Sequence, residues 1–565
     1  MTKRENTLPD DLTHKEIPGK TSGRISIAII IAAIFVAVFY FGFPDHRYLS
    51  DGLKSAIQMR DSGGLYVHPN HPLYPLLPGL IFRLMGGESS GMNELEMLLV
   101  WSMFVGVFAC WAMMAAMRAG SLSVAATVLG LGLFAFTKGI WYFSVIPAPS
   151  SSAMAPQVFA LVAIAFAMQK RPSGPSRTDI AFIGLLTALA ILASQMNAAL
   201  LLPAGFVMFQ GTTTRREKLR NLFTLLGIVV AVNIAILVIC GIAFAGVRTP
   251  AEFLSWQHSY VYDSRWWIHG FVDAFKRNWI GANEVLVAYT FRPDGLFGNW
   301  SEGFDTSMWY WRLAIRIGQA IVLFFFAFET LRAAVAYVRG VVRFPIQTVG
   351  LAVALPLIVF SFLWTPETFH YRILYIPGLI LFLAPSLEHY YGLSRFRLRK
   401  AWPILIVVIA LFATNLDTQF LPQSDPAKNP HLNEIYILKN SIGPGDVIIY
   451  SGSGDGGMRA LYAEYFLKCQ AIRVHELIPS LRLHPDEVLK DFIDKYKAGH
   501  KLLIHQDALT SEEDVDYMNR QYHMDIQPGE MLKFMESWAK PIDQFTMNGK
   551  TYFLFAPKDS FHPVG

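Results

Sequence analysis

Charge is scarce in this sequence. Asp, Glu, Lys and Arg make up 16% of the 565 residues, whereas soluble domains usually carry about 25%. Hydrophobic residues account for 53%, and the net charge of +5 is too small to indicate a nucleic-acid-binding surface. The shortage of charge and the excess of apolar residues predict an integral membrane protein and argue against nucleic acid as a partner.

Cysteine is also scarce. The sequence contains Cys110, Cys240 and Cys469, and the first two lie in apolar runs. Three cysteines at these distances form neither a disulfide framework nor a zinc-ligand spacing. We therefore expect no cofactor, and we leave open whether a divalent metal takes part.

Apolar runs recur along residues 25–416. The polar segment 1–24 predicts a disordered cytoplasmic tail, and because no small-residue cleavage site follows the first run, that run should be retained as a span. A crossing needs about 20 apolar residues, so several runs are short. The predicted fold class is an α-helical polytopic membrane protein with about eleven transmembrane helices, in the runs 25–43, 93–117, 121–139, 152–168, 179–193, 196–209, 221–245, 313–336, 347–363, 371–384 and 401–416.

Basic residues give the orientation. They cluster at 170–177, 215–220, 332–343 and 395–400, whereas the turns at 144–152, 194–197 and 365–369 contain none. Because basic loops stay in the cytoplasm, the number of crossings between successive clusters must be even. This parity favours two short helices between Arg177 and Arg215. It places loops 44–92 and 246–312 and the C-terminal segment outside, and the N-terminus inside.

Residues 417–565 have the composition of a soluble domain. Strand-like runs at 446–450, 471–475 and 501–505 alternate with helical runs at 458–467 and 486–496, and 549–555 is interpreted as an edge strand. This alternation predicts a small extracytoplasmic α/β domain. The loop from Gly452 to Gly457, with Glu476 further on, fits a dinucleotide fingerprint. Because this loop is predicted to lie outside the membrane, we favour other interpretations over dinucleotide binding. The loop would bind a sugar or an acceptor, or simply form a flexible turn.

The first external loop carries the ionisable residues Asp45, Asp51, His68 and His71. A carboxylate or imidazole close to the outer leaflet is what a transfer reaction needs as a base, and Asp45 lies two residues past the predicted membrane edge. The alternative is that Asp45 merely caps a helix over residues 48–59. For the histidines the alternatives are interfacial side chains or metal ligands, and no third ligand has a suitable spacing.

Arg372 follows His370 at the predicted external mouth of a span. An arginine there can hold a lipid phosphate through paired hydrogen bonds, or its side chain can simply extend to the interface. Loop 246–312 is rich in tryptophan and includes Arg265. Tryptophan prefers the headgroup layer, so this loop is predicted to lie along the outer surface as the wall of a lipid groove or as a structural collar.

The first loop resembles a motif of membrane glycosyltransferases of the GT-C superfamily, especially the protein O-mannosyltransferase and aminoarabinose-transferase group. That group has an Asp-Glu-x-Arg-Tyr pattern followed by a Pro-Pro-Leu-Tyr run. Here Asp45 matches the aspartate, Arg47 and Tyr48 fall near the Arg-Tyr, and the run 71–74 matches the proline-tyrosine run. His46 replaces the second acid, and the external turn 146–150 lacks the further acid of many relatives. A related branch begins its motif nearer the position of Asp51, so Asp51 stays a candidate base.

The resemblance implies a transmembrane catalytic domain over 25–416 in a bacterial inner membrane, with a role in the cell envelope. It implies inverting transfer of a sugar from a polyprenyl-phosphate carrier to a hydroxyl or amine of a glycan, lipid or protein acceptor. Other functions considered are a lipid or polysaccharide transporter or flippase, and a non-catalytic assembly protein. The catalytic candidates are Asp45 and Asp51, and the substrate-binding candidates are Arg47, Tyr48, His68, His71, Tyr74, Arg265, His370 and Arg372.

Overall fold

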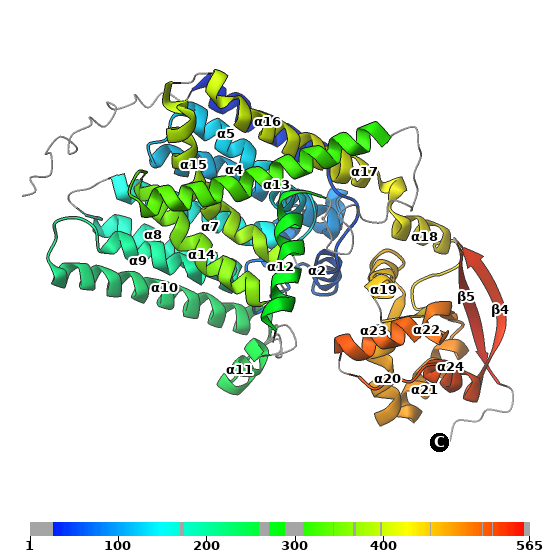
Figure 1. The fold of residues 1–565 in the computed structure, drawn as a ribbon. Coiled ribbons are helices and arrows are strands. Elements are labelled where there is room, and N and C mark those ends of the chain that lie inside the picture. Colours follow the sequence, from blue (N-terminus) through cyan, green and yellow to red (C-terminus); the bar gives the residue numbers. More distant parts are fainter. Residues whose placement is uncertain are drawn as a thin grey trace, which may run out of the picture.

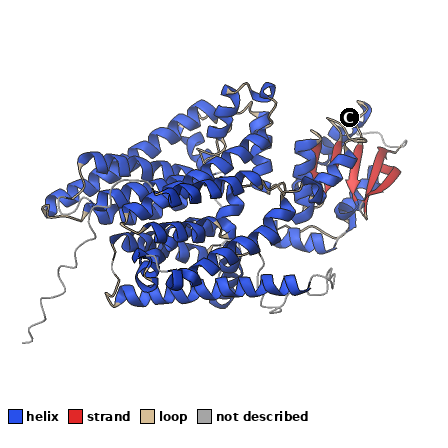
Figure 2. Ribbon diagram, turned by 90° about the horizontal axis from the view of Figure 1, so that it is seen from above, coloured by secondary structure: helices blue, strands red, loops and turns tan. Residues whose placement is uncertain are grey.

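The protein consists of a helical bundle and a C-terminal domain that contains its strands (Figures 1 and 2). The computed structural model describes residues 26–169, 174–258, 270–288, 309–342, 344–364, 369–395, 398–452, 454–510, 512–522, 524–547 and 549–558. The candidate Arg265 lies outside the described residues.

Each apolar run predicted from the sequence overlaps a helix. Seven described helices are long and apolar enough to cross a membrane, or eight if the pair α5 and α6, which is bent by 70°, is one span. The exact number of crossings therefore stays a prediction. The bundle contains α1 (Ile27–Gly42), α4 (Glu94–Ala119), α5 (Val124–Ala135), α6 (Lys138–Ser144), α7 (Pro149–Gln169), α8 (Arg177–Ala193), η3 (Gln195–Leu200), α9 (Leu201–Met208), α10 (Arg215–Phe244), α13 (Trp309–Val338), α14 (Pro345–Leu363), η6 (His370–Tyr375), α15 (Ile376–Tyr391), η7 (Leu393–Arg395), α16 (Leu398–Asn415) and the π-turn η8 (Leu416–Phe420).

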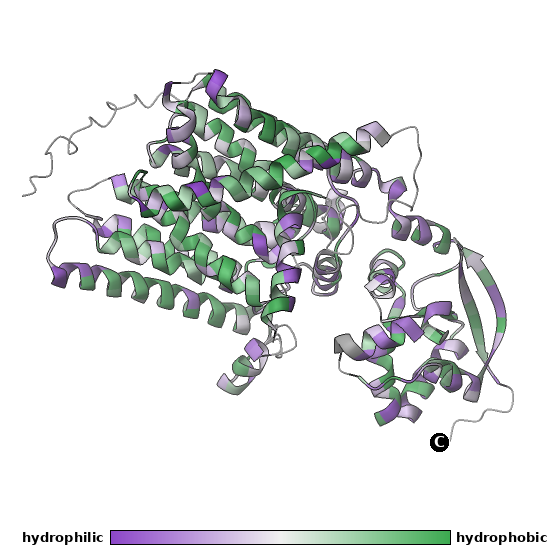
Figure 3. Ribbon diagram, viewed as in Figure 1, coloured by the Kyte–Doolittle hydropathy of each residue, from purple (hydrophilic) through white to green (hydrophobic). Residues whose placement is uncertain are grey.

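The helices of the bundle consist mostly of hydrophobic residues (Figure 3), and the outer helices expose many of their apolar side chains. On α10 only Leu225, Val229, Cys240 and Gly241 are buried, although the helix has 30 residues. Exposed apolar area of this extent suits contact with lipid, because in water it would be costly. By contrast, all seven residues of α6 are buried, so this short helix lies inside protein.

Short helices in the two segments that are predicted to be external lie at the end of the bundle near the C-terminal domain (Figure 1). The first segment folds as α2 (Ser50–Asp61), α3 (Leu76–Leu84) and η2 (Gly87–Ser90), and the second includes α11 (Pro250–His258) and α12 (Phe271–Leu286). The basic first turn of α10 lies at the opposite end, where α9 and α10 meet. The arrangement agrees with the charge pattern along the sequence, and the side of the membrane on which each end lies remains a prediction.

The C-terminal domain has a five-stranded sheet in the order β2-β1-β3-β5-β4. β1 (Val447–Tyr450) pairs in parallel with β2 (Gln470–Arg473) and with β3 (Leu502–His505), whereas β5 (Lys550–Pro557) pairs antiparallel with β3 and with β4 (Ala539–Met547). The prediction that residues 549–555 form an edge strand was wrong, because β4 covers the outer side of β5. The sequence analysis missed β4 because its middle is polar and exposed and contains Pro541.

Helices cover both faces of this sheet. The helices of the segment are α17 (Leu421–Gln423), η9 (Pro426–Lys428), α18 (Pro430–Leu438), α19 (Gly454–Phe466), α20 (Val474–Leu483), α21 (Pro485–Lys497), α22 (Gln506–Thr510), α23 (Glu512–Tyr522) and α24 (Glu530–Trp538). Ile448 and Leu503 pack with α18 and α19 on one face, whereas Val447 and Ile504 pack with the later helices on the other.

The glycine-rich loop before α19 is tightly packed. A Cβ atom on Gly456 would lie 2.1 Å from Oγ of Ser451, and one on Gly452 would lie 2.1 Å from Nδ1 of His475. Glu476 forms an ion pair with Arg473 at 2.5 Å. Packing thus explains why these two positions are glycine.

The domain is docked on the first external segment through α2. Leu53 and Ala56 of α2 belong to the same apolar cluster as Leu461 and Tyr462 of α19. Arg60 at the end of α2 donates to the backbone carbonyl of Glu464 at 3.1 Å. The two parts of the molecule therefore share one core at their contact.

Labelling with a membrane-impermeant maleimide tests the orientation. Glu88→Cys in η2 should react in intact cells, whereas Thr212→Cys between α9 and α10 should react only after permeabilisation, since both positions are exposed at opposite ends of the bundle. The unsubstituted protein is the control, because its three cysteines are buried. The reverse pattern of reactivity would show that the orientation is inverted.

Candidate active site

Asp45 is a buried carboxyl group just after α1. Asp45 is only 1% exposed to solvent. Its N–H donates to the carbonyl oxygen of Val145 at 2.8 Å, and its Oδ1 accepts from the N–H of Arg47 at 2.7 Å. Within the part of the chain that the structure describes, Oδ2 has no hydrogen-bond partner. One carboxyl oxygen is thus held in place, and the other has no hydrogen-bond partner among the described residues.

Asp45 does not cap a helix. α2 begins at Ser50, and its N-cap residue, Leu49, makes no side-chain capping bond. The helix-cap interpretation of Asp45 is therefore wrong. Asp51, by contrast, lies in the first turn of α2 with an exposed side chain. A carboxylate at that place interacts favourably with the helix dipole.

Burial also changes the acidity of this carboxyl group. It raises the pKa of Asp45 to about 8, although the N–H of Arg47 and the charge of Arg47 both act in the opposite direction. Loss of hydration disfavours the charged form of a buried acid. In this state of the protein Asp45 is mostly protonated at neutral pH and becomes a base as the pH approaches 8.

Arg47 and Tyr48 differ in their surroundings. Arg47 is exposed and lies within electrostatic range of Asp45. The hydroxyl of Tyr48 is 3.1 Å from Nδ1 of His46, and its ring packs against Tyr462 and Phe466 of α19. Tyr48 therefore belongs to the contact with the C-terminal domain, whereas Arg47 is available to a ligand.

His68 and His71 form a tight turn. The N–H of His71 donates to the carbonyl of His68 at 3.2 Å, and Nδ1 of His71 lies 3.0 Å from the carbonyl oxygen of Ala193 at the end of α8. Burial lowers the pKa of His68 to about 3 and lowers that of His71, which the Ala193 carbonyl and Asp51 partly offset. Both rings are therefore neutral at physiological pH.

Tyr74 is the last residue of the run 71–74 and is 1% exposed. Burial raises the pKa of Tyr74, and the nearby Asp51 carboxylate raises it further. Its side chain belongs to the apolar cluster that joins the first segment to the C-terminal domain. In this position Tyr74 supports the loop.

A cavity of about 700 Å³ opens beside the histidine turn. It lies between the first segment, η3, α11, α14 and η6. Its wall is apolar on the side of α14 and polar on the opposite side. The lining residues are Asn70, His71, Ser194, Gln195, Met196, Ala199, Gln257, His258, Pro356, Leu357, Phe360, Trp364 and Tyr371.

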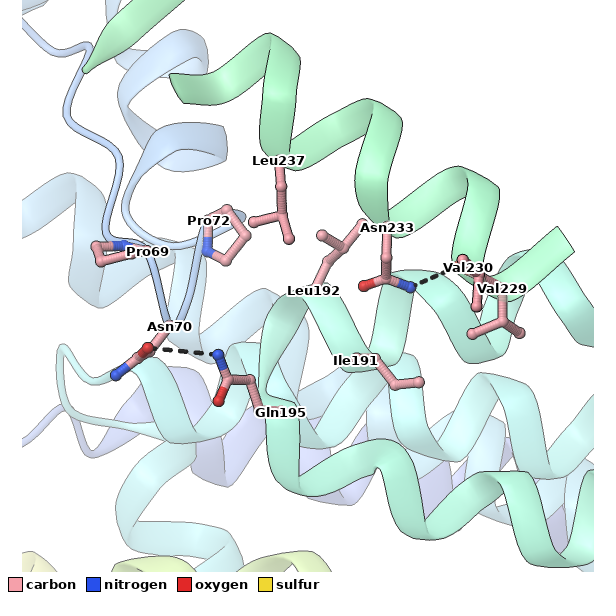
Figure 4. A pocket seen from close by; sticks show the side chains of 10 residues that line it. All are labelled: Pro69, Asn70, Pro72, Ile191, Leu192, Gln195, Val229, Val230, Asn233 and Leu237. Carbon is pink, nitrogen blue, oxygen red and sulfur yellow. Dashed lines mark hydrogen bonds between the residues drawn. The ribbon is translucent and has the colours of Figure 1, made fainter. Parts of the chain in front are cut away.

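A second cavity of about 270 Å³ adjoins the first (Figure 4). Residues of α8 and α10 line it together with Pro69 and Pro72, and most of these side chains are apolar. Asn70 and Gln195 line both cavities, and Nε2 of Gln195 donates to Oδ1 of Asn70 at 3.4 Å. These two polar residues are thus common to a mainly apolar cavity and a partly polar one.

Arg372 is buried at the start of the η6–α15 segment and is 3% exposed. Its Nη2 donates to Oδ1 of Asn278 in α12 and, at 3.3 Å, to the carbonyl of Ser361 in α14. The arginine therefore links three elements. It does not line either of the two cavities described above, so its role toward a phosphate stays a prediction.

His370 and Asp51 both lie near the histidine turn and the larger cavity. His370 packs on Phe143 of α6 and on Tyr371, a residue of the larger cavity. The Asp51 carboxylate lies within electrostatic range of His370, as it does of His71. The fold thus brings together candidates that are about 300 residues apart in the sequence.

Lys138 is a residue that the sequence analysis missed. It begins α6, is buried, and its Nζ lies 4.3 Å from the centre of the Phe369 ring. Glu284 of α12 lies within electrostatic range. An ionisable residue inside an apolar run is itself a functional signal, because it is costly unless it has a partner. Lys138 lies near the end of the predicted apolar run 121–139, so the sequence already contained this signal.

α6 also connects Asp45 with this region. Tyr142 of α6 lies within electrostatic range of Asp45, and its ring packs on Phe369 with the centres 5.6 Å apart. Among the described residues, no group of three His, Cys, Asp or Glu side chains is placed to hold a metal ion. The arrangement offers a buried carboxyl group, a neutral histidine turn and two cavities.

Comparison with known proteins identifies the fold. No family model and no curated protein sequence matches this chain. Among solved structures, ArnT from Cupriavidus metallidurans in the apo state has a TM-score of 0.55 at 12% identity, over 93% of this chain and 97% of that one. The same protein bound to undecaprenyl phosphate has a TM-score of 0.54 at 11% identity, over the same shares of both chains. The Archaeoglobus fulgidus oligosaccharyltransferase, in complex with Zn and sulfate, has a TM-score of 0.51 at 14% identity, over 87% and 70%.

At these identities the similarity is one of fold. It confirms the resemblance to GT-C membrane proteins, and it covers both the bundle and the C-terminal domain. The site residues of this chain must be judged from its own geometry.

The burial of Asp45 predicts a pH dependence of stability. Because its pKa is raised from 3.8 to about 8 on folding, the folded protein binds the proton more tightly, and the free energy of unfolding falls as the pH rises from about 4 to about 8. Asp45→Asn should lack this decrease. The midpoint of thermal unfolding of the wild type in detergent, measured from pH 5 to pH 9, should fall relative to that of Asp45→Asn as the pH rises.

The matched control is Asp61→Asn, which changes an exposed carboxylate in the same external segment. It should show the pH dependence of the wild type. Parallel curves for the wild type and Asp45→Asn would contradict the assignment of a buried, protonated Asp45.

Proposed function

We propose that the protein is a membrane glycosyltransferase that takes a sugar from a polyprenyl-phosphate carrier and transfers it to an acceptor hydroxyl or amine on the external face of the membrane. The observation that carries the proposal is the buried Asp45 carboxyl group with one unpartnered oxygen among the described residues, in a GT-C-like fold. An oriented carboxylate next to the outer leaflet is the group that such a transfer needs.

In the proposed reaction, Oδ2 of ionised Asp45 accepts the proton of the acceptor while the acceptor atom attacks the anomeric carbon of the sugar. The bond between that carbon and the phosphate oxygen breaks, and its electron pair stays with the phosphate. The products are a glycoside of inverted configuration, polyprenyl phosphate and a protonated Asp45, which then loses its proton to water. Oδ1 stays on the N–H of Arg47 and keeps the carboxyl group oriented.

The donor is proposed to occupy the two adjoining cavities. The cavity of about 700 Å³ has polar groups for the sugar phosphate, and the apolar cavity of about 270 Å³ between α8 and α10 suits the first isoprene units. The exposed apolar surface of α10 gives the rest of the chain access from the lipid. The ArnT structure bound to undecaprenyl phosphate supports a donor of this class.

Cations near η6 are proposed to stabilise the negative charge on the leaving phosphate. Arg372 was the candidate from the sequence, with Arg265 or His370, and Lys138 is a further buried cation next to Phe369. Fixed positive charge in a site of low polarity stabilises developing charge more strongly than it would in water. Loss of one such contact is expected to lower kcat rather than to weaken donor binding alone.

Asp45→Asn tests the role of the base. The variant should lose about 10²- to 10⁴-fold in kcat, because a positioned base contributes a factor of this size, while it still binds undecaprenyl phosphate. Transfer is measured with purified protein and undecaprenyl-phosphate-linked hexose, pentose and aminopentose, each labelled in the sugar, with and without glycan, lipid and protein acceptors. Asp51→Asn in the same assay decides between the two carboxylates, and Asp61→Asn is the control.

If Asp45→Asn transfers sugar like the wild type, the proposed base is wrong. If the wild type consumes none of these donors but moves them between the leaflets of a vesicle, the protein is a transporter. Sealed vesicles with the labelled donor in one leaflet distinguish the two activities.

Ala199→Trp tests the cavity. A tryptophan at this position fills part of the larger cavity, so binding of labelled undecaprenyl phosphate should weaken by about tenfold or more through steric exclusion. Leu202→Trp is the matched control, because Leu202 lies one turn further on and its side chain is exposed on the outer surface of the bundle. Equal binding by Ala199→Trp and Leu202→Trp would place the donor elsewhere.

A further inference from the structure

The segment that carries Asp45 is held by the chain that follows the last helix of the bundle. The N–H of His46 donates to the carbonyl of Gln423 at 2.9 Å, and the carbonyl of His46 accepts from Nδ2 of Asn429 at 2.6 Å. The N–H of Asp45 is bonded to Val145 on the opposite side. Residues 43–49 contain no helix or strand, so these bonds replace the secondary structure that would otherwise fix the backbone.

Asn429 uses every polar atom of its side chain in this contact. The residue is 1% exposed. Besides His46, its Nδ2 donates to the hydroxyl of Tyr462 at 2.8 Å. Its Oδ1 accepts from the N–H groups of His431 and Leu432 and so caps the start of α18.

Tyr462 extends the contact from α19. Its hydroxyl donates to the carbonyl of Tyr48 at 3.5 Å, and its ring lies against the ring of Tyr48. The backbone carbonyls of residues 46 and 48 are thus both bonded from the C-terminal domain. Asp45 and Arg47, the residues proposed to contact ligands, alternate along the chain with His46 and Tyr48, whose carbonyls are bonded.

The position of a catalytic base determines how fast it can accept a proton. Proton transfer requires the carboxyl oxygen within hydrogen-bond reach of the acceptor, and a displacement of about 1 Å can cost about 10²-fold in rate. Among the described residues, the carboxyl group of Asp45 accepts one hydrogen bond, from the N–H of Arg47. The position of its carboxyl group therefore depends on the backbone bonds of its neighbour.

We propose that Asn429 is a positioning residue of the transfer reaction: its amide fixes the peptide between His46 and Arg47, whose N–H holds Oδ1 of Asp45, and thereby aims the carboxyl group of Asp45 at the acceptor. The inference rests on the proposed function, in which Asp45 is the base. The C-terminal domain is then a part of the active site, although none of its residues needs to touch the donor.

Asn429→Asp separates positioning from folding. Aspartate caps α18 as well as asparagine does but has no N–H to donate to His46. We expect kcat to fall about 10- to 100-fold, while the KM for the donor and the binding of undecaprenyl phosphate stay close to the wild type. The matched control is Asn433→Asp, the same change one turn further along α18, where the side-chain amide donates to the carbonyl of Ala427 and to no other group that the structure describes.

Tyr462→Phe provides a second variant that keeps the ring and removes the hydroxyl group. It should lower kcat by a smaller factor than Asn429→Asp, about two- to fivefold, because His46 keeps its bond to Asn429. This variant keeps the inference testable if the buried aspartate prevents folding.

The outcomes distinguish this inference from the function on which it rests. If Asn429→Asp and Tyr462→Phe both turn over like Asn433→Asp, while Asp45→Asn is inactive, the positioning role is wrong and the proposed function stands. A parallel loss of kcat, donor binding and thermal stability in Asn429→Asp would also overturn it, since it would show a purely structural residue. Wild-type transfer by Asp45→Asn would instead refute the proposed function.

Discussion

The burial of one carboxyl group is the constraint around which this molecule is arranged. A carboxylate taken out of water loses hydration that is worth several kcal/mol, and the cost appears here as the raised pKa of Asp45. The backbone of the first loop offsets a part of the cost with the N–H of Arg47. The remaining oxygen has no partner among the described residues, so ionisation of Asp45 destabilises the folded protein.

The helical bundle and the C-terminal domain contribute to this site in different ways. The bundle supplies α6, which is buried on all sides, and the cavities beside η3. The domain supplies a shared apolar core with α2 and the amide of Asn429. Because that core contains Leu53 and Tyr462, folding of the domain and ordering of the first loop should be cooperative. A static loop of this length would otherwise lose too much conformational entropy.

Much of the fold could be predicted from the sequence, and the reasons are local. Apolar runs mark helices because the bilayer leaves few alternatives, and β1 and β3 follow from short β-branched and leucine-rich segments between turns. β4 was missed because its residues face solvent. Asp45 was found through the motif around it. The bond between Asn429 and His46 spans 383 positions, and no local pattern signals it. Arg372 was placed at the correct end of its helix, but its burial against Asn278 depends on a helix far away in the sequence.

The separation between Asn429 and His46 has a consequence for biosynthesis. A ribosome makes the loop with Asp45 early, and the bundle is inserted before residue 429 emerges. Until residues 423–462 have been translated and have folded, the loop lacks the bonds that fix it. Under the proposed function, a nascent or truncated chain would therefore sit in the membrane with its donor cavity formed but its base unaligned. The protein would become active only once it is complete, and sugar carriers would not be consumed by unfinished copies.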